Sequence, residues 1–529
     1  MVNSTHVISI HIIDDDSLLN IFYLFRPFFL GEDEDDYRSL DGGHEPWVQG
    51  RWWYRLAHVC QRWRNLILGS SSYLGLSLVC TNGTPVANML EHSPPLPLTI
   101  DYRSEDGITA QDKEGIYSAL EQRDRVRHLR LSFPVQNLRK LVLAIDEEFP
   151  ILEYLIVGPT MEDGTDLKLS ETFQAPNLHH LKLGGFACPI RPRLHPTATG
   201  LVTLYLIINH PSAYFQPNVL LQWISFMPHL ETLAILFTFP VPNRDVKRQI
   251  THTPNTAHIT LPSLRLFWFR GVSAYLEAVI CRLTTPLLED LQIQFFEELT
   301  LSVPCLPQFM NTTENLRFDR ATLDFTDEQI KLVMYSRGAK MRFFVVSVDC
   351  WHLDWQVSSV AQICNLLSQV FSPLEHLALR HKVHVRSSED HEDVDRIEWR
   401  NLLWSFNNVR TLSVEDGLVE DLSRCLRLED GELPLELLPE LHKLTYFGSR
   451  DAGGVFTSFI NSRRDAGRPV ALLMPEHRPT RVSFYLRCIL IILTRTRTLA
   501  AKTQRRIETC EFQFHAVSQN FPDSASCET

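Results

Sequence analysis

Hydrophobic residues recur along most of this chain in a short unit: an apolar residue, two variable residues, an apolar residue, one variable residue and a further apolar residue. Between residues 126 and 446 the unit reads VRHLRL (126), LEYLIV (152), LHHLKL (178), LVTLYL (201), LETLAI (230), LRLFWF (264), LEDLQI (288), LEHLAL (374), VRTLSV (409) and LHKLTY (441). Looser copies begin at 316 (LRFDRATLDF) and 343 (FFVVSV). The alternation that closes each unit predicts a short strand with one buried face.

The spacing of the units predicts a repeat protein. Successive starts lie 23 to 35 residues apart, near the period of about 20 to 29 residues that is typical of leucine-rich repeats. Several units follow a proline two residues earlier, as in FPILEYL, APNLHHL, MPHLETL, LPSLRLF, TPLLEDL and LPELHKL. Segments 218–227 and 273–283 have helical apolar spacing and are expected to cover the back of the sheet.

These observations predict an α/β leucine-rich-repeat solenoid with a curved parallel sheet over residues 81–475. One repeat cannot bury its apolar face alone, so the copies stack. The exposed strand positions vary, which is typical of a recognition surface. We therefore expect an unknown protein target on the concave face of the repeats.

A short helical module precedes the repeats, over residues 1–80. Asp14, Asp15 and Asp16 suit a helix start, where the helix dipole favours carboxylates. Apolar residues then follow at helical spacing: Leu18, Leu19, Ile21, Phe22 and Phe25. An acidic, glycine-containing insertion at 31–46 lacks the ligand spacing of a calcium loop and predicts a solvated loop.

A second apolar stripe runs through LAHVCQRWRNLIL, residues 56–68. Its members Leu56, Val59, Cys60, Trp63, Leu66 and Ile67 lie at i, i+3, i+4, i+7, i+10 and i+11. This spacing predicts one continuous helix. Cys60 then lies inside the stripe as a small hydrophobic residue, because a reactive thiolate needs an electropositive, partly open setting.

Composition excludes several classes of protein. A net charge of −12 and a pI of about 6.0 argue against a general surface for nucleic acid or anionic membrane. The eleven cysteines include no C-x-x-C pair, so neither a zinc ribbon nor a disulfide scaffold is indicated, and a reducing compartment fits. No signal peptide and no membrane span are predicted. We expect an intracellular protein, cytoplasmic or nuclear.

A search for chemistry finds no catalytic motif. The chain lacks G-x-S-x-G, the phosphate-loop, the dinucleotide and the H-E-x-x-H patterns, so we expect no enzyme activity, no cofactor and no metal. The segment 380–399 contains His381, His384 and His391 with several carboxylates, and is interpreted as a solvated loop rather than a zinc site. Trp351 and Trp355 suit either an interface anchor or packing between repeats.

The first helix together with RLAHVCQRWRNLI resembles the F-box. With the following residues up to 102, the match is similar to the large F-box-like family of mushroom-forming fungi, in which a leucine-rich-repeat solenoid follows. The sharpest part is Val59-Cys60-x-x-Trp63-Arg64, which fits the family pattern V-C-x-x-W-R. One departure is that the family usually begins helix 1 with Leu-Pro, whereas this chain has Ile12-Ile13-Asp14-Asp15.

The resemblance implies a substrate receptor of an SCF-type ubiquitin ligase, docked on a Skp-type adaptor and the cullin complex. The implied adaptor-binding residues are Leu18, Leu19, Ile21, Phe22, Leu56, Val59, Cys60, Trp63 and Leu66. Such a receptor acts by proximity and supplies no reacting group. The missing Leu-Pro keeps an alternative open, a leucine-rich-repeat interaction scaffold without a ligase role. Residues 476–529 carry no further unit and are expected to be an irregular or disordered tail.

Overall fold

The chain divides into two compact units. The computed structural model describes residues 13–25, 52–160, 167–186, 199–240, 258–298, 300–313, 315–336, 342–381, 396–429, 432–433, 435–447 and 454–474. One unit ends at Ser70, and the other spans Ser71–Pro475. The predicted boundary after residue 80 therefore moves ten residues earlier. The insertion at 31–46 and the tail at 476–529 lie outside the described residues.

The N-terminal unit contains α1 (Asp15–Leu24), α3 (Trp52–Ala57) and α4 (Gln61–Gly69). The predicted start of the first helix is confirmed, because Asp14 caps α1 by accepting a hydrogen bond from the Ser17 backbone N–H at 2.8 Å. The prediction of one continuous helix through residues 56–67 is wrong. The backbone of Cys60 is extended, with φ −157° and ψ 169°, and separates α3 from α4.

The break has a local cause in the side chain of Cys60. The Sγ atom accepts a hydrogen bond from the Trp63 backbone N–H at 3.5 Å, so Cys60 is the N-cap of α4. A capping side chain satisfies one of the N–H groups that a new helix start leaves without a partner. Cys60 is thus a capping residue at a helix boundary and not a member of a helical stripe.

The second unit is built on one sixteen-stranded sheet, with a further two-stranded pair of β8 (Ile259–Thr260) and β10 (Leu283–Thr284). Neighbouring strands of the large sheet follow in the order β1 (Leu78–Cys80), β2 (Leu98–Arg103), β3 (Val126–Phe133), β4 (Tyr154–Pro159), β5 (His180–Gly184), β6 (Thr203–Ile208), β7 (Thr232–Phe237), β9 (Leu266–Gly271), β11 (Asp290–Phe295), β14 (Phe343–Asp349), β13 (Gln329–Tyr335), β12 (Arg320–Phe325), β15 (His376–His381), β16 (Thr411–Glu415), β17 (Lys443–Phe447) and β18 (Ala471–Leu473). The pairing of β1 with β2 places residues 78–80 in the sheet.

Each of the ten regular sequence units becomes one strand of this sheet. The strand begins at the third residue of the unit in nine of them, for example at Tyr154 in the unit that starts at 152, and at the first residue in the unit at 126. The preceding proline lies in a turn, in which the first leucine of the unit donates a backbone hydrogen bond to the residue before the proline. Leu152 to Phe149 (3.3 Å) and Leu178 to Ala175 (3.1 Å) are two such bonds. Proline suits the second turn position because its φ is already fixed there.

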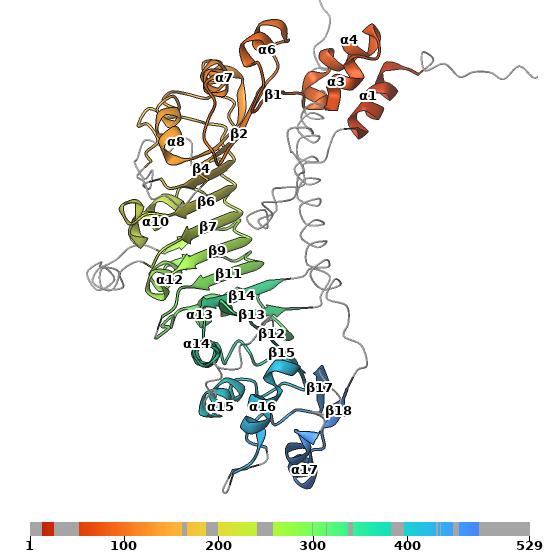
Figure 1. The fold of residues 1–529 in the computed structure, drawn as a ribbon, viewed down its shortest axis with the longest axis vertical. Helices are drawn as coiled ribbons and strands as arrows, with labels where there is room; N and C mark the ends of the chain where they lie inside the picture. The colour runs from red at the N-terminus through yellow and green to blue at the C-terminus, as the bar shows by residue number, and fades with distance from the viewer. Residues whose placement is uncertain are drawn as a thin grey trace, which may run out of the picture. The chain divides into compact units, whose positions relative to one another are not determined.

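Helices of the second unit line one face of the sheet (Figure 1). They are α5 (Ser71–Leu74), α6 (Val86–His92), α7 (Ala110–Leu120), α8 (Val135–Val142), α10 (Pro217–Ile224), α12 (Ser273–Ile280), α13 (Leu306–Asn311), α14 (Leu353–Leu366), α15 (Arg396–Trp404), α16 (Val419–Leu426) and α17 (Thr457–Asp465). The helices predicted at 218–227 and 273–283 are confirmed as α10 and α12. Buried strand residues such as Leu155 and Leu233, at 0% exposure, form the core between sheet and helices.

The sheet is mostly but not wholly parallel, which corrects the sequence prediction. Along the chain β11 is followed by β12, yet the strand beside β11 is β14, and β13 lies between β14 and β12, antiparallel to both. A buried side chain holds this insertion. Gln356 on α14, at 2% exposure, donates hydrogen bonds of 2.8 Å to the carbonyl oxygens of Thr326 and Cys350 at the two ends of the hairpin region.

Candidate binding surfaces

Helices α1 and α4 meet through residues more than forty positions apart in the sequence. The rings of Phe22 and Trp63 lie 4.8 Å apart, edge to face at 62°. Arg62 donates two hydrogen bonds to Asp15 Oδ1, at 3.0 and 2.7 Å, and one to the Ile13 carbonyl oxygen at 2.7 Å. An aromatic pair and a charge-assisted pair therefore join the two segments in which the sequence shows helical stripes.

The residues predicted to bind an adaptor divide into three groups by exposure. Leu18 (1%) and Phe22 (0%) are buried inside the unit, so their prediction as contact residues is corrected. Leu19, Leu56, Cys60, Trp63 and Leu66 are half-buried. Ile21 and Val59 are exposed, at 38% and 59%.

Sequence reasoning missed the most exposed apolar residues of this unit. Leu24 is 75% exposed and Phe25 is 62% exposed, and with Ile21 they lie at i, i+3 and i+4 on one stripe at the end of α1. Leu18 and Phe22 occupy the opposite, buried side. The stripe Ile21–Leu24–Phe25, called here the α1 stripe, has the spacing that amphipathic helices use to bind in a groove of a partner.

The sheet of the second unit has an open face, the face opposite the helices. Over the six strands β3, β4, β5, β6, β7 and β9, the parallel register arranges the open-face residues in three rows. The first row is His128, Tyr154, His180, Thr203, Thr232 and Leu266. The second is Arg130, Ile156, Lys182, Tyr205, Ala234 and Trp268. The third is Ser132, Gly158, Gly184, Ile207, Leu236 and Arg270. We call these rows the β3–β9 face.

The first row begins with a ladder of rings. His128 and Tyr154 lie edge to face at 4.7 Å, and Tyr154 stacks on His180 at 4.2 Å with an angle of 5° between the rings. Burial lowers the pKa of His128 to about 4, with Arg127 adding to the effect. Burial also lowers the pKa of His180 to about 4, reinforced by His179 and His128. Both imidazoles are therefore neutral at physiological pH.

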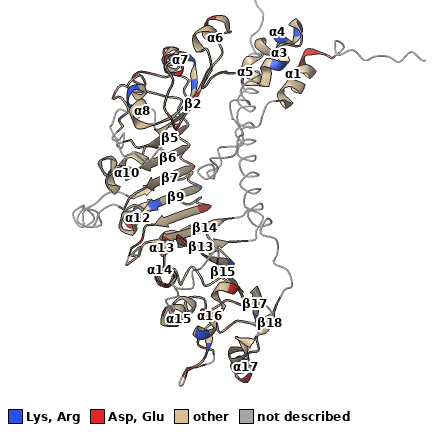
Figure 2. Cartoon of the chain, viewed as in Figure 1, with Lys and Arg blue, Asp and Glu red and all other residues tan. Residues whose placement is uncertain are grey.

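Charges differ between the two halves of the open face. Among the three rows described for β3–β9, the charged side chains are Arg130, Lys182 and Arg270, and none is Asp or Glu. From β11 onward the open-face positions carry both signs, with Asp290, Asp324, Asp349 and Glu415 alternating with Arg320, Lys331, Arg380 and Lys443. Figure 2 marks the charged residues along the sheet. The β3–β9 face is thus a cationic and aromatic segment in a chain of net charge −12.

The two tryptophans singled out in the sequence are exposed. Trp351 is 68% exposed and Trp355 47% exposed. Trp355 lies in the first turn of α14, beside the ring of His352 at 5.4 Å. Both belong to the helical side of the unit and not to its open face.

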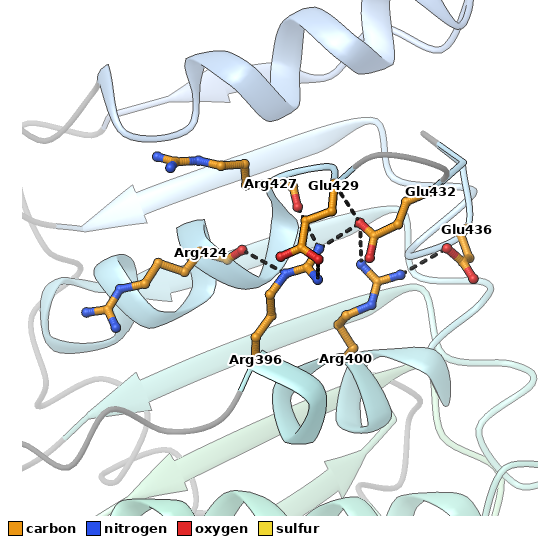
Figure 3. Close-up of polar contacts among 7 residues, drawn as sticks. All are labelled: Arg396, Arg400, Arg424, Arg427, Glu429, Glu432 and Glu436. Carbon is orange, nitrogen blue, oxygen red and sulfur yellow. Dashed lines mark hydrogen bonds and ion pairs between the residues drawn. The ribbon is translucent and has the colours of Figure 1, made fainter.

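The densest group of ion pairs joins α15 to the segment after α16 (Figure 3). Arg396 contacts Glu432 at 2.6 Å and Glu429 at 3.0 Å, and Arg400 contacts Glu432 at 3.2 Å and Glu436 at 2.9 Å. The hydrogen bond from Arg396 lowers the pKa of Glu432 and raises that of Arg396. Because every carboxylate drawn already faces a guanidinium, we interpret the group as a clamp between repeats.

Within the described part of the chain, no group of three or more His, Cys, Asp or Glu side chains is placed to hold a metal ion. His384 and His391, considered as zinc ligands, lie outside the described residues. Seven described cysteines are free thiols, and burial raises the pKa of Cys350 and Cys425 to about 12. No described helix is long and apolar enough to cross a membrane.

Comparisons with known proteins give one distant structural likeness. No family model matches the chain, and no curated protein matches it. Among solved structures, the leucine-rich repeat-containing protein LegL7 from Legionella pneumophila aligns over 73% of this chain and 97% of its own, with 10% identity and a TM-score of 0.24. A score this low supports no argument, so the repeat architecture rests on the strand register and the helices described above.

Proposed function

We propose that this chain is a substrate receptor, in which the N-terminal helical unit docks on a Skp-type adaptor of a cullin complex and the open face of the sheet holds a protein target. The chain acts inside the cell, in the cytoplasm or nucleus, and supplies no reacting group. Its role in ubiquitin transfer is to keep the target near the enzyme that carries ubiquitin, which is catalysis by proximity.

The α1 stripe carries this proposal. Three apolar side chains exposed at 38% to 75% at one helix end cost free energy in water and are typical of a surface that a partner covers. The buried side of the same helix rests on Trp63 through Phe22. The V-C-x-x-W-R residues therefore stabilise and orient the stripe, and the stripe makes the contact.

The experiment is co-expression of the full chain with a Skp-type adaptor, followed by size-exclusion chromatography. Wild type is expected to elute with the adaptor at equal stoichiometry. The double variant Leu24→Asp/Phe25→Asp is expected to lose the complex, because two carboxylates cannot enter an apolar groove without large desolvation costs. Leu143→Asp, at a position that is 73% exposed on the second unit, is the matched control.

The second candidate function is an interaction scaffold without a ligase role. It is favoured by Ile12-Ile13-Asp14-Asp15, where the F-box-like family has Leu-Pro. A wild-type protein that remains monodisperse and elutes apart from the adaptor would replace the receptor proposal with this one.

A further inference from the structure

The chemistry of the β3–β9 face narrows the kind of partner it fits, on the premise of the proposed function that the open face holds a protein. Arg130 and Lys182 lie in the second row, two strands apart, with Ile156 between them. Lys182 also lies over the Tyr205 ring at 5.5 Å. An aromatic ring stabilises a cation without cancelling its charge, so this row keeps its positive character.

Carboxylates at the borders of the face already accept hydrogen bonds. Asp101, in register with Arg130 on β2, accepts two from Arg103, at 3.0 and 3.1 Å. At the other border, Asp349 accepts from Arg270 at 3.3 Å and from Gln294 at 2.8 Å. The described side chains along the sheet thus leave the β3–β9 face complementary to negative charge.

Strand spacing sets the distance between the two cations. Neighbouring strands lie about 4.8 Å apart, so the backbones that carry Arg130 and Lys182 are separated by about 9.6 Å. Three residues of a polyproline II segment rise about 9.3 Å and return the side chain to the same side. Three residues further the segment reaches β7, where Ala234 lies between the larger residues Tyr205 and Trp268.

We propose that the β3–β9 face binds an extended acidic segment of a protein partner, with carboxylates three residues apart on Arg130 and Lys182 and an apolar side chain three residues further on, against Tyr205 and Trp268. The segment crosses the strands instead of adding to their edge. Affinity comes from charge complementarity, and the aromatic residues at one end fix the direction of the segment.

Single-stranded nucleic acid also combines negative charge with aromatic stacking. The acidic peptide is favoured because the whole chain has a net charge of −12, which opposes the approach of a polyanion. Three cations on the described rows also form a short track for a phosphate backbone. An oligonucleotide is therefore one arm of the test.

The test measures fluorescence anisotropy of labelled peptides with the full-length protein. The acidic probe has the sequence LPSEPSEPSL, whose leucines at both ends allow either direction of binding. Its two controls carry glutamine or lysine in place of both glutamates, and oligo-dT is the nucleic acid probe. The protein variant is Arg130→Glu/Lys182→Glu. Its matched control is Lys331→Glu/Lys443→Glu, which makes the same charge change on the open face beyond β11.

Wild type is expected to bind the glutamate probe more tightly than the glutamine probe, with a preference that weakens at higher salt. Arg130→Glu/Lys182→Glu should weaken that binding about tenfold or more and should bind the lysine probe instead, whereas the control variant should change it less than about twofold. Gain of lysine-probe binding shows that the variant is folded, and circular dichroism checks each protein.

Three results would overturn the inference: wild type that does not bind the glutamate probe, equal binding of the glutamate and glutamine probes, or binding that the Arg130→Glu/Lys182→Glu variant retains. Preferred binding of oligo-dT that is lost in that variant would assign the face to nucleic acid. Adaptor co-elution is measured on the same preparation. Loss of the adaptor complex with intact peptide binding overturns the ligase role alone, and the reverse pattern overturns this inference alone.

Discussion

Phe22 and Trp63 contact each other edge to face across two helices, with ring centroids 4.8 Å apart. Phe22 is completely buried, whereas Trp63 is half-buried. The pair therefore works as a hinge point between the interior of the helical unit and its surface. It also explains why the tryptophan of the V-C-x-x-W-R pattern matters without a direct contact to a partner.

Replacing this tryptophan tests the packing. Trp63→Ala should destabilise the helical unit by about 2–3 kcal/mol, which is below the usual range for a fully buried tryptophan because part of the ring already faces solvent. Trp63→Phe should cost less than half of that. Hydrogen exchange of the full chain is the measurement: amides of 15–24 and 61–69 should lose protection, while those of β6 and β7 keep theirs. Unchanged protection in α1 would contradict the contact.

Substitutions at Cys60 separate a capping role from a packing role. If the Sγ atom caps α4, Cys60→Ser should hold or raise stability by a few tenths of a kcal/mol, because a hydroxyl is a preferred cap, and Cys60→Ala should cost about 0.5–1 kcal/mol. A residue that only packed in an apolar stripe would give the opposite order. Hydrogen exchange at the Trp63 amide distinguishes the two.

The paired histidines predict a dependence of stability on pH. Both have a folded pKa of about 4, below the ordinary value of 6.5. The unfolded chain therefore binds more protons in this window, and the stability they contribute is present above pH 6.5 and is lost as the pH falls toward 4. The loss should be on the order of 1–3 kcal/mol for the pair. Urea unfolding of wild type and of His128→Gln/His180→Gln is the measurement, and an equally steep fall in both proteins would refute the assignment.

The clamp around Arg396 and Arg400 predicts a second effect at lower pH. The pKa of Glu432 is lowered in the folded state, so its contribution is present above the ordinary carboxyl pKa and is lost as the pH falls through the lowered one. Glu432→Gln should cost about 1–2 kcal/mol at neutral pH, since charge-assisted hydrogen bonds to two arginines are lost at a site that is partly open to solvent. Glu420→Gln, in an exposed pair with Arg424, should change stability by less than about 0.5 kcal/mol. Urea midpoints of both variants test the difference.

Local patterns determined most of the repeat architecture. The alternating apolar residues of each unit placed the strands, because a buried strand face requires that period wherever it packs. The proline before Leu152 or Leu230 marked a turn, because its fixed φ suits one turn position in any context. Helices α10 and α12 followed from their apolar spacing for the same reason. Each of these features is set by residues only a few positions apart.

Contacts between distant residues decided the rest. The antiparallel strand β13 and the exchange of β12 and β14 depend on which edges meet, and no periodicity within a strand encodes its neighbour. The end of α3 depends on a capping bond from Cys60 that competes with a continuous stripe. The side of α1 that faces solvent was fixed only when Phe22 met Trp63, which buried Leu18 and left Leu24 and Phe25 exposed. Likewise, the cationic row of Arg130 and Lys182 exists only because the parallel register places residues 52 positions apart in one line.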